Sequence, residues 1–586
     1  MKAYKNFNVA AYVYAYYLDK ADESEIQRGI DYFNKYIPLS KVYLETHRAT
    51  TDIPLEKMKR AIEVFKRNGI AVSGGITSTG TIGGNEKPSL FDTFCFSDPD
   101  YRKKYLDIVE YTASLFDEII LDDYFFTSCR CELCIENKGS RSWAQFRLEL
   151  MEDISREIVA LAKKVNPKCN FIIKYPNWYE SYQETGYNPG KQKDIFDMIY
   201  AGTETRTAQY SQQHLQRYLS YSIIRLFENV APNRNGGGWI DLGGSWDNMN
   251  RWLEQANLTM LARAKELMLF NFYTMIGSPE LPPLGQELYR IDSILDKAGN
   301  PIGVSTYEPY DADGEDQVLN YIGMCGIPFE PKPYFDDDAP VLFLSETSAC
   351  DPDIMKKLES YVRKGGNAIV TTGFLKETYG MGIKEMTSVR LTGRYVRGNE
   401  YMIDRYNATA SACVKAADPA SFEVLSYKTN ATWSEVIMLS NEDSYPVMTE
   451  DRYGRGYLYI LNLPQDFADL FKLPKEVWRM IAKRFAKGGK VFVGANPKYN
   501  LFAYDNDVYG IISYRPMREV TEIIIKGDDV KAIEDIETGE VIMKSHTLPG
   551  PSKRGDSATY EKEPSENVFS VAMMPGKMRF FRLVKK

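Results

Sequence analysis

The chain has 586 residues, a length that predicts two to four domains rather than a single core. Hydrophobic content of 44% and charged content of 26% are typical of a globular protein, and no apolar run reaches the roughly 18–20 residues of a membrane span. The formal net charge of −8 argues against nucleic acid as the partner. The 41 tyrosines suit a protein that stacks flat apolar faces, as sugar binders do, although a Tyr-rich core explains them equally well.

From the N-terminus to about residue 300, strand-like apolar runs alternate with helical segments such as 54–69, 142–167 and 247–266. The runs cover residues 8–19, 41–48, 70–78, 118–126, 170–179, 197–206, 237–244 and 267–275. Eight such repeats predict a (β/α)8 TIM barrel over residues 1–300. An open doubly wound sheet is the alternative, but the first strand lacks the glycine fingerprint of a dinucleotide site.

The first run reads as a strand rather than as the apolar region of a signal peptide. We therefore expect a soluble protein that is cytoplasmic, or periplasmic or secreted if a signal peptide has been removed.

The pattern changes after residue 300. Residues 339–375 read as strand, helix, glycine turn and strand, and a further strand at 453–464 and a helix at 474–489 follow. This predicts a Rossmann-like α/β domain over 301–490. No phosphate loop follows its strands, which favours a structural or oligomerisation role. Period-two alternation over 491–586 predicts an antiparallel β-sandwich.

Polar and aromatic side chains gather where the barrel strands end, which is where TIM-barrel active sites lie. They are Glu45, His47 and Arg48 after the second strand, Asp122 and Asp123 after the fourth, Lys174, Asn177 and Trp178 after the fifth, Glu204 and Arg206 after the sixth, and Trp239 and Asp241 at the seventh. One such residue would be a solvated loop residue, but five strand ends together indicate a site.

Glycoside hydrolysis needs two carboxyl groups that flank the scissile bond. Asp123 is the first member, and its partner is Glu204, Asp241 or, as a distant third, Glu280. We favour Glu204, because on an extended segment Arg206 would point the same way and could hold a carboxylate or a sugar hydroxyl. The acid and nucleophile roles of Asp123 and Glu204 stay interchangeable at this point.

The remaining residues of this set are candidates for binding the substrate. Asp122 points the opposite way from Asp123 on a strand, so it could bind a hydroxyl or cap a helix. His47 and Arg48 could bind hydroxyls or the carboxylate of an acidic sugar. The candidate platforms for sugar faces are Trp178, Tyr179, Trp239 and Trp246, and the other candidate contacts are Glu45, Lys174, Asn177 and Arg206.

Four cysteines belong to two neighbouring barrel loops. Cys129, Cys131 and Cys134 form a C-x-C-x-x-C group after the fourth strand, and Cys95 follows the third. Four thiolates could close a tetrahedral zinc site, which would be structural because no position stays open for water. Four free thiols are the alternative.

These cysteines resemble those of the family-42 β-galactosidases. In that family a cysteine before "xSPxYR" and a C-x-C-x-x-C group bind zinc, and this chain has "CFSDPDYR" and "CRCELC". The stretch "VLFLSETSACDPDIMKKLESYVRKGGNAIVTT" resembles the family's glutaminase-like trimerisation domain. The resemblance implies a barrel, that domain over 301–490, a small β domain, structural zinc at the four cysteines and a homo-oligomer, with a trimer as the state of the family.

The resemblance also has a departure. The family's fourth strand ends in Asn-Glu, whereas this chain has Asp122 and Asp123, so Asp123 takes the acid/base position. No family nucleophile motif is found near the seventh strand, so galactose specificity does not carry over.

We therefore expect a glycoside hydrolase that acts on plant or host glycan oligosaccharides, without an organic cofactor or a nucleic-acid partner. One alternative is a carbohydrate binder that has lost catalysis. Another is a different sugar-active barrel enzyme (transglycosidase, lyase or isomerase), with Asp122, Asp123 and Glu204 as ligands of a divalent metal. With only three histidines in the chain, a His-based catalytic metal site is not expected.

Overall fold

The computed structural model describes residues 3–83, 87–207, 215–243, 248–403, 413–548 and 565–585. The chain divides into two compact units. The first comprises Met1–Asp296 and Tyr310–Ala312, and the second comprises Lys297–Pro309 and Asp313–Lys586. Within the described residues, no helix combines the length and the apolar character needed to cross a bilayer.

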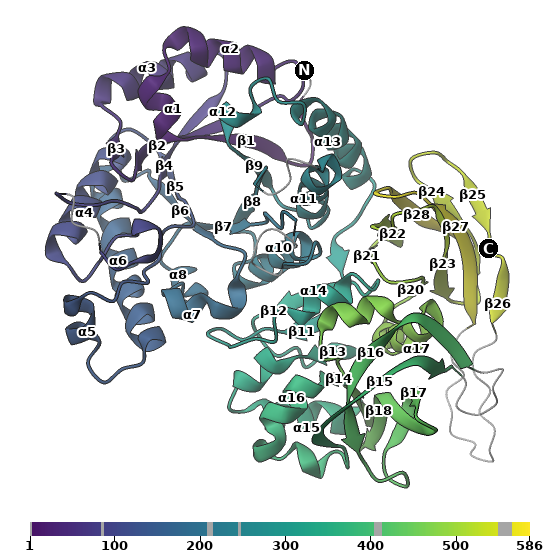
Figure 1. Cartoon of the computed structure of the whole chain (residues 1–586). Coiled ribbons are helices and arrows are strands. Elements are labelled where there is room, and N and C mark those ends of the chain that lie inside the picture. Colours follow the sequence, from purple (N-terminus) through teal and green to yellow (C-terminus); the bar gives the residue numbers. More distant parts are fainter. Residues whose placement is uncertain are drawn as a thin grey trace. The chain divides into compact units, whose positions relative to one another are not determined.

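The first unit is a closed barrel of eight parallel strands, which confirms the predicted TIM barrel (Figure 1). The strands are β1 (Asn8–Val13), β2 (Lys41–Arg48), β4 (Ala71–Ile76), β5 (Glu118–Leu121), β6 (Asn170–Tyr175), β7 (Met198–Gly202), β8 (Asn235–Asp241) and β9 (Glu266–Phe270). The ring closes where β1 pairs with both β9 and β2. The short strand β3 (Thr51–Asp52) adds antiparallel to the end of β2.

Helices surround the barrel strands, as their apolar periodicity predicts. The longer ones are α2 (Glu23–Phe33), α3 (Leu55–Arg67), α4 (Pro99–Ala113), α6 (Trp143–Val165), α10 (Leu219–Val230), α11 (Met249–Leu261) and α13 (Leu281–Leu295). Short helices lie on the loops: α1 (Ala15–Lys20), α5 (Glu132–Lys138), α7 (Tyr182–Thr185), α8 (Pro189–Gln192) and α12 (Phe272–Met275).

The first apolar run is divided between two elements rather than forming one strand. Strand β1 ends at Val13, and α1 begins at Ala15. The Ala15 N–H donates to a carboxylate oxygen of Glu45 at 2.6 Å, so the chain turns at the barrel mouth to satisfy a buried carboxylate.

Large side chains fill the barrel interior, which is therefore a packed core and not a pore. The inward-facing layer includes Tyr12, Tyr43, Tyr200 and Trp239, all nearly inaccessible to solvent. Side chains beyond this layer on the carboxyl side of the strands form the barrel mouth.

The opposite, amino-terminal end of the barrel holds a compact ion cluster. The ammonium of Lys41 lies 2.8 Å from Glu118 and 3.2 Å from Glu266, and the Tyr43 hydroxyl lies within hydrogen-bonding distance of both carboxylates. Because each carboxylate has a cation and a hydroxyl partner, this end is a closed structural cluster.

The second unit begins with an α/β layer, as predicted. Its parallel strands run in the order β12-β11-β13-β14-β19. They are β11 (Val304–Tyr307), β12 (Phe329–Lys332), β13 (Val341–Leu344), β14 (Asn367–Thr371) and β19 (Gly456–Leu461), and the helices of this layer are α14 (Val318–Gly323), α15 (Ile354–Lys364), α16 (Thr372–Thr378) and α17 (Lys475–Phe485).

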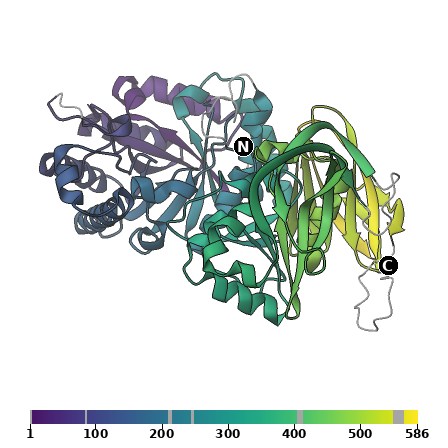
Figure 2. The same ribbon diagram turned by 60° about the horizontal axis from the view of Figure 1, so that its bottom comes forward.

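Four long antiparallel strands extend this sheet, and the sequence analysis did not predict them. They are β15 (Arg390–Met402), β16 (Cys413–Ser426), β17 (Trp433–Ser440) and β18 (Asp443–Tyr453), which curve side by side as the long green ribbons of Figure 2. Buried and exposed residues do not alternate along β15, because residues on both of its faces are exposed. The strand therefore lacks the period-two signal in the sequence.

The C-terminal region consists of two antiparallel sheets, which confirms the predicted sandwich. The first contains β10 (Pro301–Ile302), β21 (Tyr499–Tyr504), β22 (Val508–Ser513), β24 (Val530–Asp535), β25 (Val541–Met543) and β28 (Met578–Lys585), and the second contains β20 (Val491–Gly494), β23 (Glu519–Lys526), β26 (His546–Leu548) and β27 (Glu566–Met573). One apolar core joins both sheets, with Leu501 and Ile511 from one and Ile523 and Phe569 from the other.

Candidate active site

The centre of the barrel mouth is a lysine held between two carboxylates. Lys174, near the end of β6, lies 2.9 Å from Asp123 Oδ2 and 3.0 Å from Glu204 Oε1. The side chain of Lys174 is only 1% exposed and that of Glu204 4%, whereas that of Asp123 is 18% exposed. Of the three groups, Asp123 is therefore the one that faces the solvent.

A second network fixes the neighbouring Asp122. Its carboxylate pairs with Arg48 at 2.9 Å and accepts a bond from the Thr77 hydroxyl at 3.1 Å. Glu45 holds Arg48 from the other side at 2.9 and 3.0 Å, and it also accepts from Tyr12. Asp122 and Glu45 are thus occupied inside the protein, which makes them supports for Arg48 rather than free contacts for a sugar.

The adjacent aspartates have opposite pKa shifts. The pKa of Asp123 is raised to about 7. Burial is the main cause, the negative charges of Asp122 and Glu204 also raise it, and the positive charge of Lys174 lowers it in part. Burial would also raise the pKa of Asp122, but Lys174 and Arg48 outweigh it and hold that pKa below its usual value. Asp123 can therefore carry a proton near neutral pH while Asp122 stays charged.

The ammonium of Lys174 stays protonated in this environment. Burial alone would lower its pKa, but Asp123, Glu204 and Asp122 together raise it above the usual value. The cation also lies 4.2 Å from the centre of the Trp239 ring, which supports it from the barrel core.

Arg206 does not accompany Glu204 as the sequence analysis expected. Its backbone turns at a φ of 52°, so the segment is not extended at this residue. The guanidinium instead makes a two-point contact with Asp241, at 3.0 and 2.6 Å. Asp241 is therefore neutralised by Arg206.

Two candidate substrate contacts are buried and occupied. Both ring nitrogens of His47 face acceptors, Asp52 at 2.5 Å and the Thr79 carbonyl at 2.7 Å, and the residue is fully buried. Trp239 is 2% exposed and packs on Tyr12 within the barrel core. His47 is a structural link between loops, because both of its ring nitrogens are occupied, and Trp239 forms the floor of the site.

The loop after β6 provides a support and a partly open aromatic side chain. The Asn177 amide donates to the backbone carbonyl of Glu204 at 3.0 Å, so it holds the loop that carries this carboxylate. Trp178 is partly exposed and meets Phe126 edge-on at 6.3 Å. Tyr179 is also partly exposed, and Trp246 lies outside the described residues.

Glu280, the third candidate partner of Asp123, is the buried N-cap residue of α13.

Three residues of the site were not anticipated. The Thr77 hydroxyl lies within hydrogen-bonding distance of both Glu45 and Asp122, and it could have been found because it directly follows the third barrel strand. The Tyr187 hydroxyl donates to the Asp123 carbonyl at 2.6 Å, and no sequence signal marks it. Gly202 is the last residue of β7 and lies against the Glu204 carboxylate, and the sequence analysis did not single it out.

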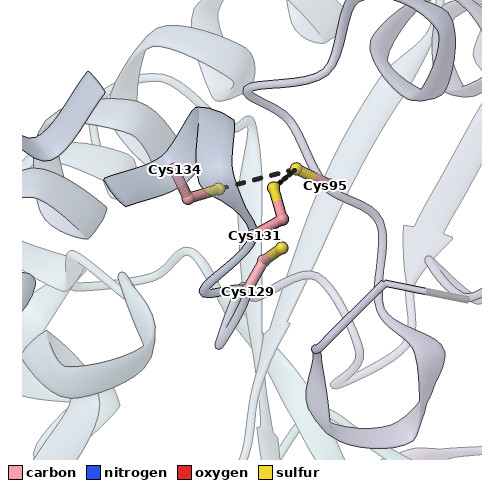
Figure 3. Close-up of side chains that lie close together, drawn as sticks. All are labelled: Cys95, Cys129, Cys131 and Cys134. Carbon is pink, nitrogen blue, oxygen red and sulfur yellow. Dashed lines mark hydrogen bonds between the residues drawn. The ribbon is translucent and has the colours of Figure 1, made fainter. Parts of the chain in front are cut away.

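The four predicted cysteine ligands lie together beside this site (Figure 3). The four sulfurs, of Cys95, Cys129, Cys131 and Cys134, all lie within 4.8 Å of one another. The sulfur of Cys95 lies 3.7 Å from that of Cys131 and 3.5 Å from that of Cys134. Zinc–sulfur bonds of ~2.3 Å in a tetrahedron place sulfurs ~3.8 Å apart, so the observed arrangement fits a zinc ion.

Comparisons with known proteins agree with this architecture. Residues 1–285 match the model of a probable glycosyl hydrolase catalytic domain, 299–466 the second domain of the uncharacterized protein SSO3021, and 490–583 a probable glycosyl hydrolase C-terminal domain. That uncharacterized protein, from Saccharolobus solfataricus, is 24% identical over 512 residues, which cover 78% of this chain and 82% of the relative.

Solved structures share the fold along the whole chain. Gan42B, a family-42 β-galactosidase from G. stearothermophilus, has a TM-score of 0.63 at 11% identity and covers 100% of this chain and 99% of its own. The α-L-fucosidase isoenzyme 2 of Paenibacillus thiaminolyticus has a TM-score of 0.66 at 11% identity and covers 100% of both chains. The structural likenesses establish the fold, and the family models identify its barrel as a glycosyl hydrolase catalytic domain. The chain is a glycoside hydrolase whose barrel and C-terminal domain match the models of probable glycosyl hydrolases, and it shares its fold with the family-42 β-galactosidases.

Proposed function

We propose that the barrel cleaves glycosidic bonds with retention of the anomeric configuration, with Asp123 as general acid/base and Glu204 as nucleophile. The observation that carries this proposal is the single nitrogen of Lys174 between them. Because it lies 2.9 and 3.0 Å from one oxygen of each, these oxygens are at most about 5.9 Å apart, the sum of the two distances. Retaining enzymes place the carboxyl groups ~5–5.5 Å apart, whereas inverting enzymes need ~6.5–9.5 Å.

The proton distribution supports these two roles. A general acid must hold a proton near the working pH, and Asp123, with its pKa of about 7, meets this requirement. A nucleophile must be ionised, and Glu204 has the ammonium of Lys174 as its counter-ion. Oε2 of Glu204 is buried and has no hydrogen-bond partner among the residues that the structure describes, so no hydrogen bond from these residues ties down this second oxygen.

The other chemistries fit the site less well. Asp241 is a weaker partner for Asp123 because its charge is bound to Arg206. A Schiff-base lyase would need a neutral lysine, but carboxylates surround Lys174 and keep its ammonium form. The same ammonium occupies the space among Asp122, Asp123 and Glu204 that a divalent cation would need.

The test combines a substrate panel with two variants. The wild-type protein, Asp123→Asn and Glu204→Gln are incubated with aryl glycosides and with plant and host oligosaccharides, and NMR identifies the anomer released first. We expect retention, with each variant losing at least ~100-fold in rate. Asp241→Asn is the matched control and should stay closer to the wild type.

The outcomes separate the alternatives. Inversion would exclude Glu204 as a nucleophile. A fully active Asp123→Asn would place the chemistry on other carboxylates. Sugar binding without cleavage by the wild-type protein would favour the non-catalytic binder.

We also propose that the four cysteines hold a structural zinc ion. Their thiolates would stabilise the loop that follows Asp122 and Asp123, and four sulfurs leave no position for catalytic water. We further propose three domains over 1–300, 301–490 and 491–586, and a homo-oligomer, with a trimer as the state that the resemblance of the middle domain to the glutaminase-like trimerisation domain implies. Metal analysis and light scattering test the zinc and the oligomer respectively.

A further inference from the structure

Lys174 has a position that substrate binding alone does not explain. Its side chain is 1% exposed, and its nitrogen makes two short contacts with Asp123 and Glu204 and a longer one of 3.7 Å with Asp122. The ring of Trp239 lies beneath it. The ammonium is therefore an internal part of the carboxylate cluster rather than a cation presented to solvent.

We propose that Lys174 is a positioning residue that holds Asp123 and Glu204 at their catalytic spacing and sets the pH at which Asp123 loses its proton. The inference rests on the proposed roles of Asp123 and Glu204, and it adds a residue through which both act.

The geometry supports the spacing role. Two carboxylates this close repel each other when both are charged, and an ammonium that bonds to one oxygen of each offsets that repulsion. The lysine chain comes from β6, while Asp123 follows β5 and Glu204 follows β7, so the nitrogen links three successive strand ends. Because Trp239 packs beneath the nitrogen, its position is set by the barrel core.

The balance of charges at the barrel mouth supports the effect of Lys174 on the proton of Asp123. Asp122, Asp123 and Glu204 face the positive charges of Lys174 and Arg48, and Arg48 is shared with Glu45. Without Lys174 the cluster would gain an uncompensated negative charge, and the carboxyl groups would bind protons more tightly. The alkaline limb of the pH–rate profile would then move to higher pH, because Asp123 would keep its proton longer.

The chain itself provides a matched control. Lys41 also bridges two carboxylates, Glu118 and Glu266, at 2.8 and 3.2 Å, but at the opposite end of the same barrel. Lys41→Met breaks a comparable ion cluster away from the mouth. It should lower the melting temperature without moving the pH–rate profile.

The experiment measures kcat and KM against pH for the wild-type protein, Lys174→Met, Lys174→Gln and Lys41→Met on the best aryl glycoside. We expect both Lys174 variants to lose at least ~100-fold in kcat/KM, mainly in kcat, because misplaced catalytic groups cost about this much. The alkaline limb of their profiles should shift upwards by about one pH unit or more. Lys174→Gln keeps a hydrogen-bond donor without the charge and serves if Lys174→Met does not fold.

Two results would overturn the inference. A Lys174 variant with a wild-type pH profile, whether its loss lies in kcat or in KM, would leave Lys174 as a packing residue or a plain substrate contact. An equal pH shift in Lys41→Met would show that the effect is general to the barrel. Neither result touches the proposed function, which is tested separately by the anomer released first and by the activities of Asp123→Asn and Glu204→Gln.

Discussion

Replacing Gly202 by alanine should displace the proposed nucleophile without removing any functional group. Gly202 is the last residue of β7, two positions before Glu204. A Cβ atom at Gly202 would lie 2.6 Å from Oε2 of Glu204 and 3.2 Å from its carboxyl carbon. Ordinary contacts are ~3.4 Å or longer, so the carboxylate must move by roughly 0.8 Å.

The expected magnitude follows from this displacement. A misplacement of ~1 Å in a catalytic group can reduce the rate ~100-fold, which corresponds to an increase of ~2.7 kcal/mol in the activation free energy. The fold should tolerate the change, because the clash involves the end of a side chain, and alanine is preferred over glycine within a strand by ~0.5–1 kcal/mol. Activity should therefore fall far more than stability.

The assay compares kcat/KM on an aryl glycoside with the melting temperature. Gly236→Ala is the control, because its added Cβ would meet the flexible methyl end of Met198 at 3.0 Å, in the same barrel but away from Glu204. We expect Gly202→Ala to lose ~100-fold and Gly236→Ala to stay close to the wild type. A Gly202→Ala protein with activity within ~3-fold of the wild type would refute the placement of Glu204 as nucleophile.

Three further predictions concern the proton of Asp123, the ion pair between Arg206 and Asp241, and the proposed zinc ion. Because the acid must be protonated and the pKa of Asp123 is about 7, kcat/KM should fall with rising pH above that value, and a flat pH–rate profile to pH 9 would exclude Asp123 as the acid. Asp241→Asn weakens the contact with Arg206 but leaves Glu204 intact, so steady-state kinetics should show a loss in kcat of less than ~10-fold. Metal analysis should find about one zinc per chain, and Cys131→Ser should lose the zinc and lower the melting temperature, whereas a metal-free wild type with unchanged melting would contradict the zinc site.

The local pattern of the sequence was sufficient for the barrel and for the list of candidate residues. Strands that are buried on both faces appear as apolar runs, and eight runs that alternate with amphipathic helices leave few other folds. The rule that active sites lie at the carboxyl ends of barrel strands then selected Asp123, Lys174 and Glu204. The C-x-C-x-x-C spacing and the place of Cys95 in the neighbouring barrel loop similarly indicated which four thiols lie together. The long strands of 390–453 escaped this reasoning, because their faces are not cleanly divided between core and solvent.

Only the tertiary structure decided which of these residues interact. Lys174 lies 51 positions from Asp123 in the chain and 30 from Glu204, and their contacts depend on the register of neighbouring strands, which an apolar pattern does not specify. The positive φ of Arg206 directs its guanidinium to Asp241, and the pairing of β3 with β2 closes His47 against Asp52. The sequence by itself determined which chemical groups reach the barrel mouth, whereas the register of the closed barrel determined their partners, and with them the charge of each group.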